Sequence, residues 1–136
     1  MNNWLKMSAI FIILLVSIVN NGYSASIESQ LQNLARETRK SLPMRIGDDD
    51  IQATNITVVG KTVLSTYNFL RRKSQLGNIN NVKPVYYKSS VNTACTSPDT
   101  LKMLKLGVSF VYEYYDVDNI FVMTFTIDQN TCRGLK

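Results

Sequence analysis

The apolar residues of this chain follow three patterns, each typical of one kind of structure. An almost uninterrupted apolar run covers residues 7 to 19, helical spacing begins at residue 26, and alternation of apolar and polar positions dominates from residue 51 onward. Spacing near 3.6 residues indicates an amphipathic helix, and alternation indicates a half-buried strand. The pattern therefore predicts one targeting segment followed by a folded domain that contains both helices and strands.

The first folded element is a helix expected over residues 26 to 42. Its apolar residues form one stripe between Gln, Glu, Arg and Lys residues, and the stripe consists of Ile27, Leu31, Leu34, Ala35 and Leu42. Ser26 is suited to cap the first turn, and Pro43 lacks the N–H needed to continue the helix. We expect the stripe to pack against a sheet rather than to form an exposed partner-binding or membrane surface.

Two strand pairs are predicted. Residues 51 to 59 and 62 to 71 are rich in β-branched and aromatic residues, and Gly60-Lys61 between them is a hairpin signal. Residues 108 to 116 and 120 to 128 form a second hairpin. Alternation places seven of its side chains on one side, and these are Phe110, Tyr112, Tyr114, Phe121, Met123, Phe125 and Ile127. Glu113, Thr124 and Thr126 lie opposite, and a structural role is favoured over a recognition role for Tyr112, Tyr114 and Tyr115.

The segment between the two hairpins is expected to be helical in its second part. Residues 74 to 83 have a loop-like composition, and Pro84 is expected to open a helix that runs to Cys95. Ser97-Pro98 then predicts the start of a short second helix, and Gly107 predicts its end. Together the patterns predict an α/β (α+β) fold for residues 25 to 136, a single small domain with an antiparallel-rich sheet of about four to five strands flanked by helices.

The N-terminal apolar run has the layout of a secretory signal peptide. Lys6 precedes the run, and Gly22 and Ser24 are the small residues expected before a cut that follows Ser24. The run of about 13 residues is shorter than the roughly 20 needed to span a bilayer. We therefore expect residues 1 to 24 to be removed on export, leaving no stable membrane anchor, and no cysteine follows the cut as a lipid acceptor.

The exported part contains two cysteines, Cys95 and Cys132. In an oxidising compartment this even number favours one disulfide, which would close a loop of about 37 residues and remove roughly 3 to 4 kcal/mol of chain entropy from the unfolded state. A metal site or a nucleophile is the alternative. The chain contains no histidine, which excludes a Cys/His dyad, a Ser-His-Asp triad and histidine-based metal sites.

Charge favours no particular ligand. The chain has 15 Lys and Arg and 10 Asp and Glu residues; only Lys6 lies in the expected signal, which leaves 14 basic and 10 acidic residues, a formal charge of +4. Basic residues cluster at positions 71 to 73 and at Arg36, Arg39 and Lys40, but no aromatic residues interleave with them as a platform for bases would require. We expect a solvated surface and no nucleic-acid partner.

The carboxylates form no recognisable catalytic or metal-binding motif. Asp48, Asp49 and Asp50 lack the alternating spacing and the distal Glu of a calcium loop, and a polar turn is favoured. Glu113 and Asp116 are expected to be solvated, in turns or on strand exteriors, rather than paired as acid and base. The sequence therefore predicts no catalytic residue, no cofactor and no metal, and a chain that is not an enzyme.

The C-terminal half resembles the disulfide-bonded pilotins of type II secretion systems, the AspS-like (GspS-beta) class. The resemblance is carried by Cys95 before a short helix, by Gly107 leading into a Tyr-containing hairpin, and by the closing segment Asp128-Gln-Asn-Thr-Cys132. It implies a five-stranded sheet and a non-enzymatic periplasmic protein that binds the C-terminal helical segment of a secretin, or another envelope protein, in a groove. Without a cysteine at the cut, the chain resembles a non-lipidated variant, and the resemblance assigns no partner-binding residues.

A second functional interpretation stays open. An exported inhibitor or immunity protein that blocks an exported enzyme would also be a small, disulfide-bonded binding domain. Its expected feature is a protruding loop, and residues 71 to 83 are the candidate for that loop.

Overall fold

The computed structural model describes residues 26–46 and 50–134, so the expected signal peptide and the residues Asp48 and Asp49 lie outside the described residues. Ten elements follow one another in these parts of the chain: α2 (Ile27–Arg39), β1 (Met44–Arg45), β2 (Ile51–Val59), β3 (Thr62–Phe69), the 3₁₀ helix η1 (Lys73–Gln75), α3 (Ile79–Thr96), α4 (Pro98–Lys105), β4 (Ser109–Tyr115), β5 (Phe121–Ile127) and α5 (Gln129–Arg133).

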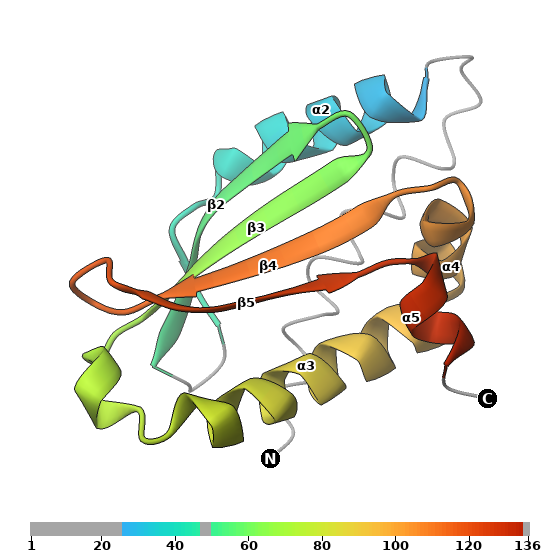
Figure 1. Cartoon of the computed structure of the whole chain (residues 1–136). Coiled ribbons are helices and arrows are strands. Elements are labelled where there is room, and N and C mark those ends of the chain that lie inside the picture. The colour runs from blue at the N-terminus through green and yellow to red at the C-terminus, as the bar shows by residue number, and fades with distance from the viewer. Residues whose placement is uncertain (1–25, 47–49, 135–136) are drawn as a thin grey trace.

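The five strands lie side by side in the order in which they occur in the sequence. All neighbours are antiparallel except β3 and β4, which are parallel. Parallel neighbours require a crossover connection, and η1, α3 and α4 provide it. In Figure 1, α2 runs along β2 near one edge of the sheet and α3 runs below β5 near the opposite edge. The expected α+β domain with an antiparallel-rich sheet is thereby confirmed.

Both predicted hairpins are present, and their turns follow from local backbone requirements. Val59 pairs with Thr62, which leaves Gly60 and Lys61 as a two-residue connection between β2 and β3. Gly60 has a φ of +58°, the left-handed value that glycine adopts without steric cost. In the second hairpin Tyr112 pairs with Phe125. The prediction that Phe121 shares the side of Met123 and Phe125 is wrong, because the register shift between Tyr114 and Tyr115 pairs Phe121 with Tyr115, and Phe121 is exposed.

One face of the sheet carries the core, because alternation brings the apolar side chains of β2 to β5 to the face where the helices pack. A first cluster joins α2, α3 and α4 to the sheet through Leu31, Leu34, Val91, Leu104, Ile56, Phe110 and Ile127. A second cluster is rich in aromatic rings and contains Ile51, Tyr67, Phe69, Tyr114, Met123 and Phe125. The stripe of α2 therefore packs on the sheet, as expected.

The start of α3 differs from the sequence prediction. The helix begins at Ile79 rather than at Pro84, so the proline lies inside it. Asn78 caps the first turn, since its side chain accepts a 2.9 Å hydrogen bond from the N–H of Asn80. Ile79 and Val82 pack against the aromatic cluster, and this packing outweighs the single helical hydrogen bond that a proline removes.

Smaller differences occur at other helix ends and at two short elements. α2 ends at Arg39, before Pro43, and Lys40 closes its last turn with a 3.2 Å hydrogen bond to the carbonyl of Glu37. β1 and α5 were not expected, because elements of two and five residues are too short to show a periodic pattern.

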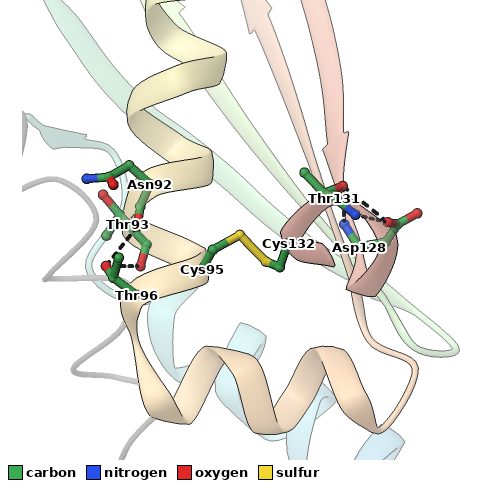
Figure 2. The surroundings of a disulfide bond; sticks show 7 residues. All are labelled: Asn92, Thr93, Cys95, Thr96, Asp128, Thr131 and Cys132. Carbon is green, nitrogen blue, oxygen red and sulfur yellow. Dashed lines mark hydrogen bonds between the residues drawn. A yellow bond between two sulfur atoms is a disulfide. The ribbon is translucent and has the colours of Figure 1, made fainter. Parts of the chain in front are cut away.

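The two cysteines are joined, as expected from their number and from export. Cys95 lies in the last turn of α3 and Cys132 lies in α5, and their Cα atoms are 5.4 Å apart. Figure 2 shows the bond reaching from the end of α3 to the short helix that follows β5. Asp128 caps that helix by accepting a 3.0 Å hydrogen bond from the N–H of Thr131. The disulfide therefore ties the end of the sheet to the helical crossover.

Candidate functional site

A cleft of about 330 Å³ opens where β2 begins and β3 ends, beside η1 and the first half of α3. Its apolar lining consists of Ile51, Phe69, Leu76, Val82, Val85 and Tyr86. Its polar rim consists of Asp50, Arg71, Gln75 and Asn81. An apolar cleft of this size with a few polar groups at its edge is typical of a binding site.

The floor of the cleft is built from aromatic rings that pack against one another. Phe69 is buried and meets the ring of Tyr86 edge-on, with the ring centroids 5.7 Å apart. Tyr86 in turn contacts the buried ring of Tyr114 at 5.4 Å. By contrast, the side chain of Val85 is 56% exposed at the helical wall. The cleft thus combines a packed aromatic floor with an apolar wall that is open to solvent.

Two arginines lie beside the single carboxylate at the rim of the cleft, Arg71 in the lining and Arg45 outside it. The carboxylate of Asp50 lies 2.9 Å from Nε of Arg71 and 3.6 Å from a guanidinium nitrogen of Arg45. The backbone carbonyl of Asp50 also accepts a 2.7 Å hydrogen bond from the N–H of Leu70, which fixes the position of this residue beside the end of β3. The arginine side chains are largely exposed and that of Asp50 is 44% exposed, so these ion pairs contribute little to stability.

Three tyrosines of the core face are held in the neutral form. Burial raises the pKa of Tyr112 to about 12. Burial, and next the neighbouring Tyr112, raises the pKa of Tyr67, while burial and next Tyr67 raise the pKa of Tyr114. The rings of Tyr67 and Tyr114 are stacked with centroids 5.0 Å apart. These tyrosines build the core, whereas Tyr115 lies on the opposite face of the sheet, where its hydroxyl donates to Glu113 at 2.9 Å.

Asp116 is not a solvated turn residue, and the structure corrects that expectation. Its side chain is buried, with a relative exposure of 3%, at the end of β4. The carboxylate accepts backbone hydrogen bonds of 2.8 to 2.9 Å from Lys73, Asp118 and Ile120. Burial acts to raise the pKa of Asp116, but these hydrogen bonds outweigh it and the pKa is lowered. The carboxylate therefore organises the loop between β4 and β5.

The remaining candidate groups do not converge on one catalytic centre. Asp50 lies at the rim of the cleft, and Glu113 lies on the strand face opposite the core. Within residues 26–46 and 50–134, no group of three or more His, Cys, Asp or Glu residues could hold a metal ion. In the same part of the chain, no helix has the length and apolar character needed to cross a membrane.

Residues 71 to 83 are largely exposed but are not a simple loop, because they contain η1 and the start of α3. Leu76, Ile79 and Val82 pack against the aromatic cluster, and the backbone N–H of Lys73 is bound to Asp116. The segment forms one wall of the cleft instead. The cleft has no local signal in the sequence, because its walls come from three separate segments. The apolar residues Leu76, Ile79 and Val82 in an otherwise polar stretch indicate packing only.

Comparison with known proteins identifies the fold. No protein-family model matches the chain, and no curated protein matches it. Three solved structures resemble it, and the first is a protein of Pseudomonas aeruginosa considered to be secreted, with a TM-score of 0.65 and 22% identity over 81% of this chain and 100% of that one. The pilotin EpsS of the Vibrio vulnificus type 2 secretion system has a TM-score of 0.61 and 14% identity over 77% of this chain and 90% of that one. The type II secretion pilotin AspS of Vibrio cholerae has a TM-score of 0.55 and 15% identity over 89% of this chain and 97% of that one.

Proposed function

We propose that this protein, which has the fold of the type II secretion pilotins EpsS and AspS, is a non-catalytic secretion accessory protein that binds a protein partner in the cleft beside α3. The observation that supports this proposal is the apolar, open-sided cleft on that fold. The proposed partner is the C-terminal helical segment of a secretin or a comparable segment of another envelope protein.

The cleft suits an amphipathic helix. A helix places apolar side chains at every third or fourth position on one face, and such a row can be buried against an apolar groove. Ile51, Phe69 and Tyr86 provide a floor for these side chains. Val85, exposed on the wall, would lose its contact with water only when the cleft is filled. Apolar burial at these positions is thus the proposed source of affinity.

The rim suits a partner segment that carries a carboxylate. Arg71 and Arg45 share the single carboxylate of Asp50 in the described structure. An acidic side chain of the partner, placed beside Arg71, would supply the second negative charge without displacing the apolar contacts. We expect this contact to set the orientation of the bound helix rather than to dominate its affinity.

The proposed location is the periplasm. Removal of residues 1 to 24 would release a domain whose Cys95–Cys132 bond suits an oxidising compartment. Without a lipid acceptor at the cut, the domain would reach its partner by diffusion and not from a membrane anchor.

A direct test is binding to a peptide that reproduces the last helical segment of a secretin encoded in the same genome. Fluorescence anisotropy would measure its Kd for the exported protein and for two variants, Val85→Asp in the cleft and Val59→Asp at the end of β2. Both valines are exposed, at 56% and 78%. We expect Val85→Asp to raise Kd about tenfold or more and Val59→Asp to leave it unchanged.

A second measurement covers the case of a different partner. A photo-crosslinking residue placed at position 85, with position 59 as the control, would capture neighbours in living cells. Capture of an envelope or secretion subunit from position 85 alone supports the proposal. Capture of an exported hydrolase supports the inhibitor interpretation, and equal capture from both positions argues against a role for the cleft.

A further inference from the structure

The face of the sheet that points away from the helices carries a second, chemically different hollow. It has a volume of about 660 Å³, and its lining comes from β2, β3 and the β4–β5 hairpin. The floor is made of hydroxyl and amide side chains, namely Gln52, Thr54, Asn55, Thr66 and Asn68. Tyr115, Val117 and Asn119 line one end. None of these eight residues is charged.

The floor of this hollow is held in place by hydrogen bonds. The hydroxyl of Thr54 lies 2.9 Å from Oδ1 of Asn68 and 3.2 Å from the carbonyl of Thr66. The amide nitrogen of Asn68 donates to the carbonyl of Asp116 at 3.0 Å and to Oδ1 of Asn119 at 2.8 Å. Asn68 therefore fixes the floor to the loop that carries the end wall.

The end wall is equally ordered. The ring of Tyr115 meets the ring of Phe121 at a centroid distance of 5.9 Å, and the Tyr115 hydroxyl donates to Glu113. Val117, the next wall residue, follows the buried carboxylate of Asp116 and donates its N–H to the carbonyl of Arg71 at 3.2 Å. A ligand would meet a preformed surface and would not have to order a loop on binding.

Several polar groups of the hollow remain available. Among the described residues, no hydrogen bond uses the side-chain amide of Gln52, the hydroxyl of Thr66, or the amide nitrogens of Asn55 and Asn119. An amide offers a donor and an acceptor together, and a hydroxyl offers both in one group. The hollow can thus exchange hydrogen bonds with a ligand that carries many neutral donors and acceptors.

We propose that this hollow binds a neutral glycan strand. Sugars present hydroxyl groups at their edges, which match the amides and hydroxyls of the floor, and an apolar C–H face, which matches the ring of Tyr115. Nucleic acids, phosphates and anionic headgroups are bound mainly through Lys or Arg side chains, and the lining has none. A helical peptide requires a continuous apolar groove, which the floor lacks.

The glycan site is separate from the cleft beside α3. The cleft opens toward the aromatic core and the helices, whereas the hollow lies on the other side of β2 and β3. Both can be occupied at once. The protein would then hold a protein partner on one side of the sheet and a glycan strand on the other.

Nuclear magnetic resonance titration of the exported protein tests the proposal with two neutral probes, tri-N-acetylchitotriose and maltotriose. We expect either probe to shift backbone amide signals around Gln52, Thr66 and Tyr115, with a Kd on the order of 1 mM. The affinity should not change at high salt, because no charge is engaged. If neither probe shifts these signals up to its solubility limit, the proposal is wrong.

Matched variants separate the hollow from the rest of the face. Tyr115→Ala should raise Kd about tenfold, while Tyr115→Phe, which keeps the ring, should stay within about twofold of the original protein. Thr66→Ala in the hollow should weaken binding, and Thr126→Ala, exposed on β5 outside it, should not. The assignment is overturned if Kd is unchanged in a folded Tyr115→Ala protein. It is also overturned if only a sulfated oligosaccharide binds and its binding depends on salt.

Discussion

Oδ2 of Asp116 accepts a 2.8 Å hydrogen bond from the backbone N–H of Lys73, a residue 43 positions earlier in the chain. The other carboxylate oxygen accepts from the N–H groups of Asp118 and Ile120. The segment after β3, which forms a wall of the cleft, and the loop after β4, which forms a wall of the hollow, are therefore anchored on one side chain. Both proposed binding surfaces depend on this anchor.

Acid should lower the free energy of unfolding because it protonates the carboxylate of Asp116. Its pKa is lowered in the folded state, so the stability due to the ionised carboxylate is complete above the unfolded pKa of about 3.9 and is lost as pH falls through the folded value. In Asp116→Asn, an amide N–H₂ would face backbone donors, and one or more of them would lose its acceptor. We expect this variant to be less stable at neutral pH and to show a smaller acid dependence, measured by urea unfolding across the acid range.

Glu37→Gln is the control for this prediction. Glu37 also has a lowered pKa, first because Lys40 donates a hydrogen bond to it, but its side chain is exposed on α2. Its replacement should change stability little. Identical acid dependence in the Asp116→Asn variant and the original protein would show that the buried carboxylate is not the source.

The disulfide should account for much of the stability of the domain. Replacing both Cys95 and Cys132 with alanine releases the constraint on the unfolded chain, and we expect the free energy of unfolding to fall by about 3 to 4 kcal/mol. Urea unfolding of the two proteins measures the difference. A reductant should lower the stability of the original protein by the same amount and should not change that of the variant. Alkylation of Cys95 or Cys132 in the original protein without reductant would contradict the pairing.

Strong alkali should unfold the protein before its core tyrosines ionise freely. The pKa of Tyr112 is about 12, and those of Tyr67 and Tyr114 are also raised. Tyrosines in the unfolded chain lose their protons near pH 10, whereas the buried tyrosines of the folded state stay neutral. Ionisation therefore stabilises the unfolded state alone, and the free energy of unfolding falls as pH rises above about 10. Tyrosinate absorbance and circular dichroism should therefore change together for these residues.

Tyr114→Phe tests whether Tyr114 contributes to the loss of stability in alkali. This variant keeps the packing volume, so it should remain folded, and its absorbance step at unfolding should be smaller by one tyrosine. Complete tyrosine ionisation while the circular dichroism signal is still native would disagree with the buried positions of the three rings.

Export should leave Ala25 as the first residue of the protein. Mass spectrometry of the exported form measures the cut directly. Ser24→Tyr places a large side chain next to the cut, where small residues are required, and should cause the precursor to accumulate. Asn20→Gln, farther from the cut, should be processed normally. Exported protein that still contains residues 1 to 24 would refute the signal-peptide prediction.

The hairpins could be predicted because their information is local. Residues two apart along Phe110, Tyr112 and Tyr114 must share a face in any extended strand, and the structure buries Phe110 and Tyr114 there. The start of α3 could not be predicted in this way. Pro84 gave a local signal for a helix start, whereas the packing of Ile79 and Val82 against rings from other strands decided the outcome.

Both proposed binding surfaces depend in part on contacts between segments that are distant in the sequence. The cleft requires that Ile51, Phe69 and Tyr86 come together, and the hollow requires β2 beside β3 with Tyr115 at its end. The predicted β2–β3 hairpin already pairs Ile51 with Phe69, but Tyr86 is added by the packing of α3 and Tyr115 by the parallel pairing of β3 with β4. No periodic pattern in the sequence indicates these last two contacts. Asp116 shows the same limit, because its burial depends on backbone groups from both sides of the crossover.

We expect the parallel junction between β3 and β4 to form late when the domain assembles. Each hairpin closes through a short turn, but the central ladder must wait until the whole crossover between Phe69 and Ser109 has been completed. A chain that crosses a membrane from its N-terminus would therefore acquire its first hairpin early and its continuous sheet only at the end. We expect premature termination within the crossover to leave β3 with an unpaired edge, which is prone to aggregation.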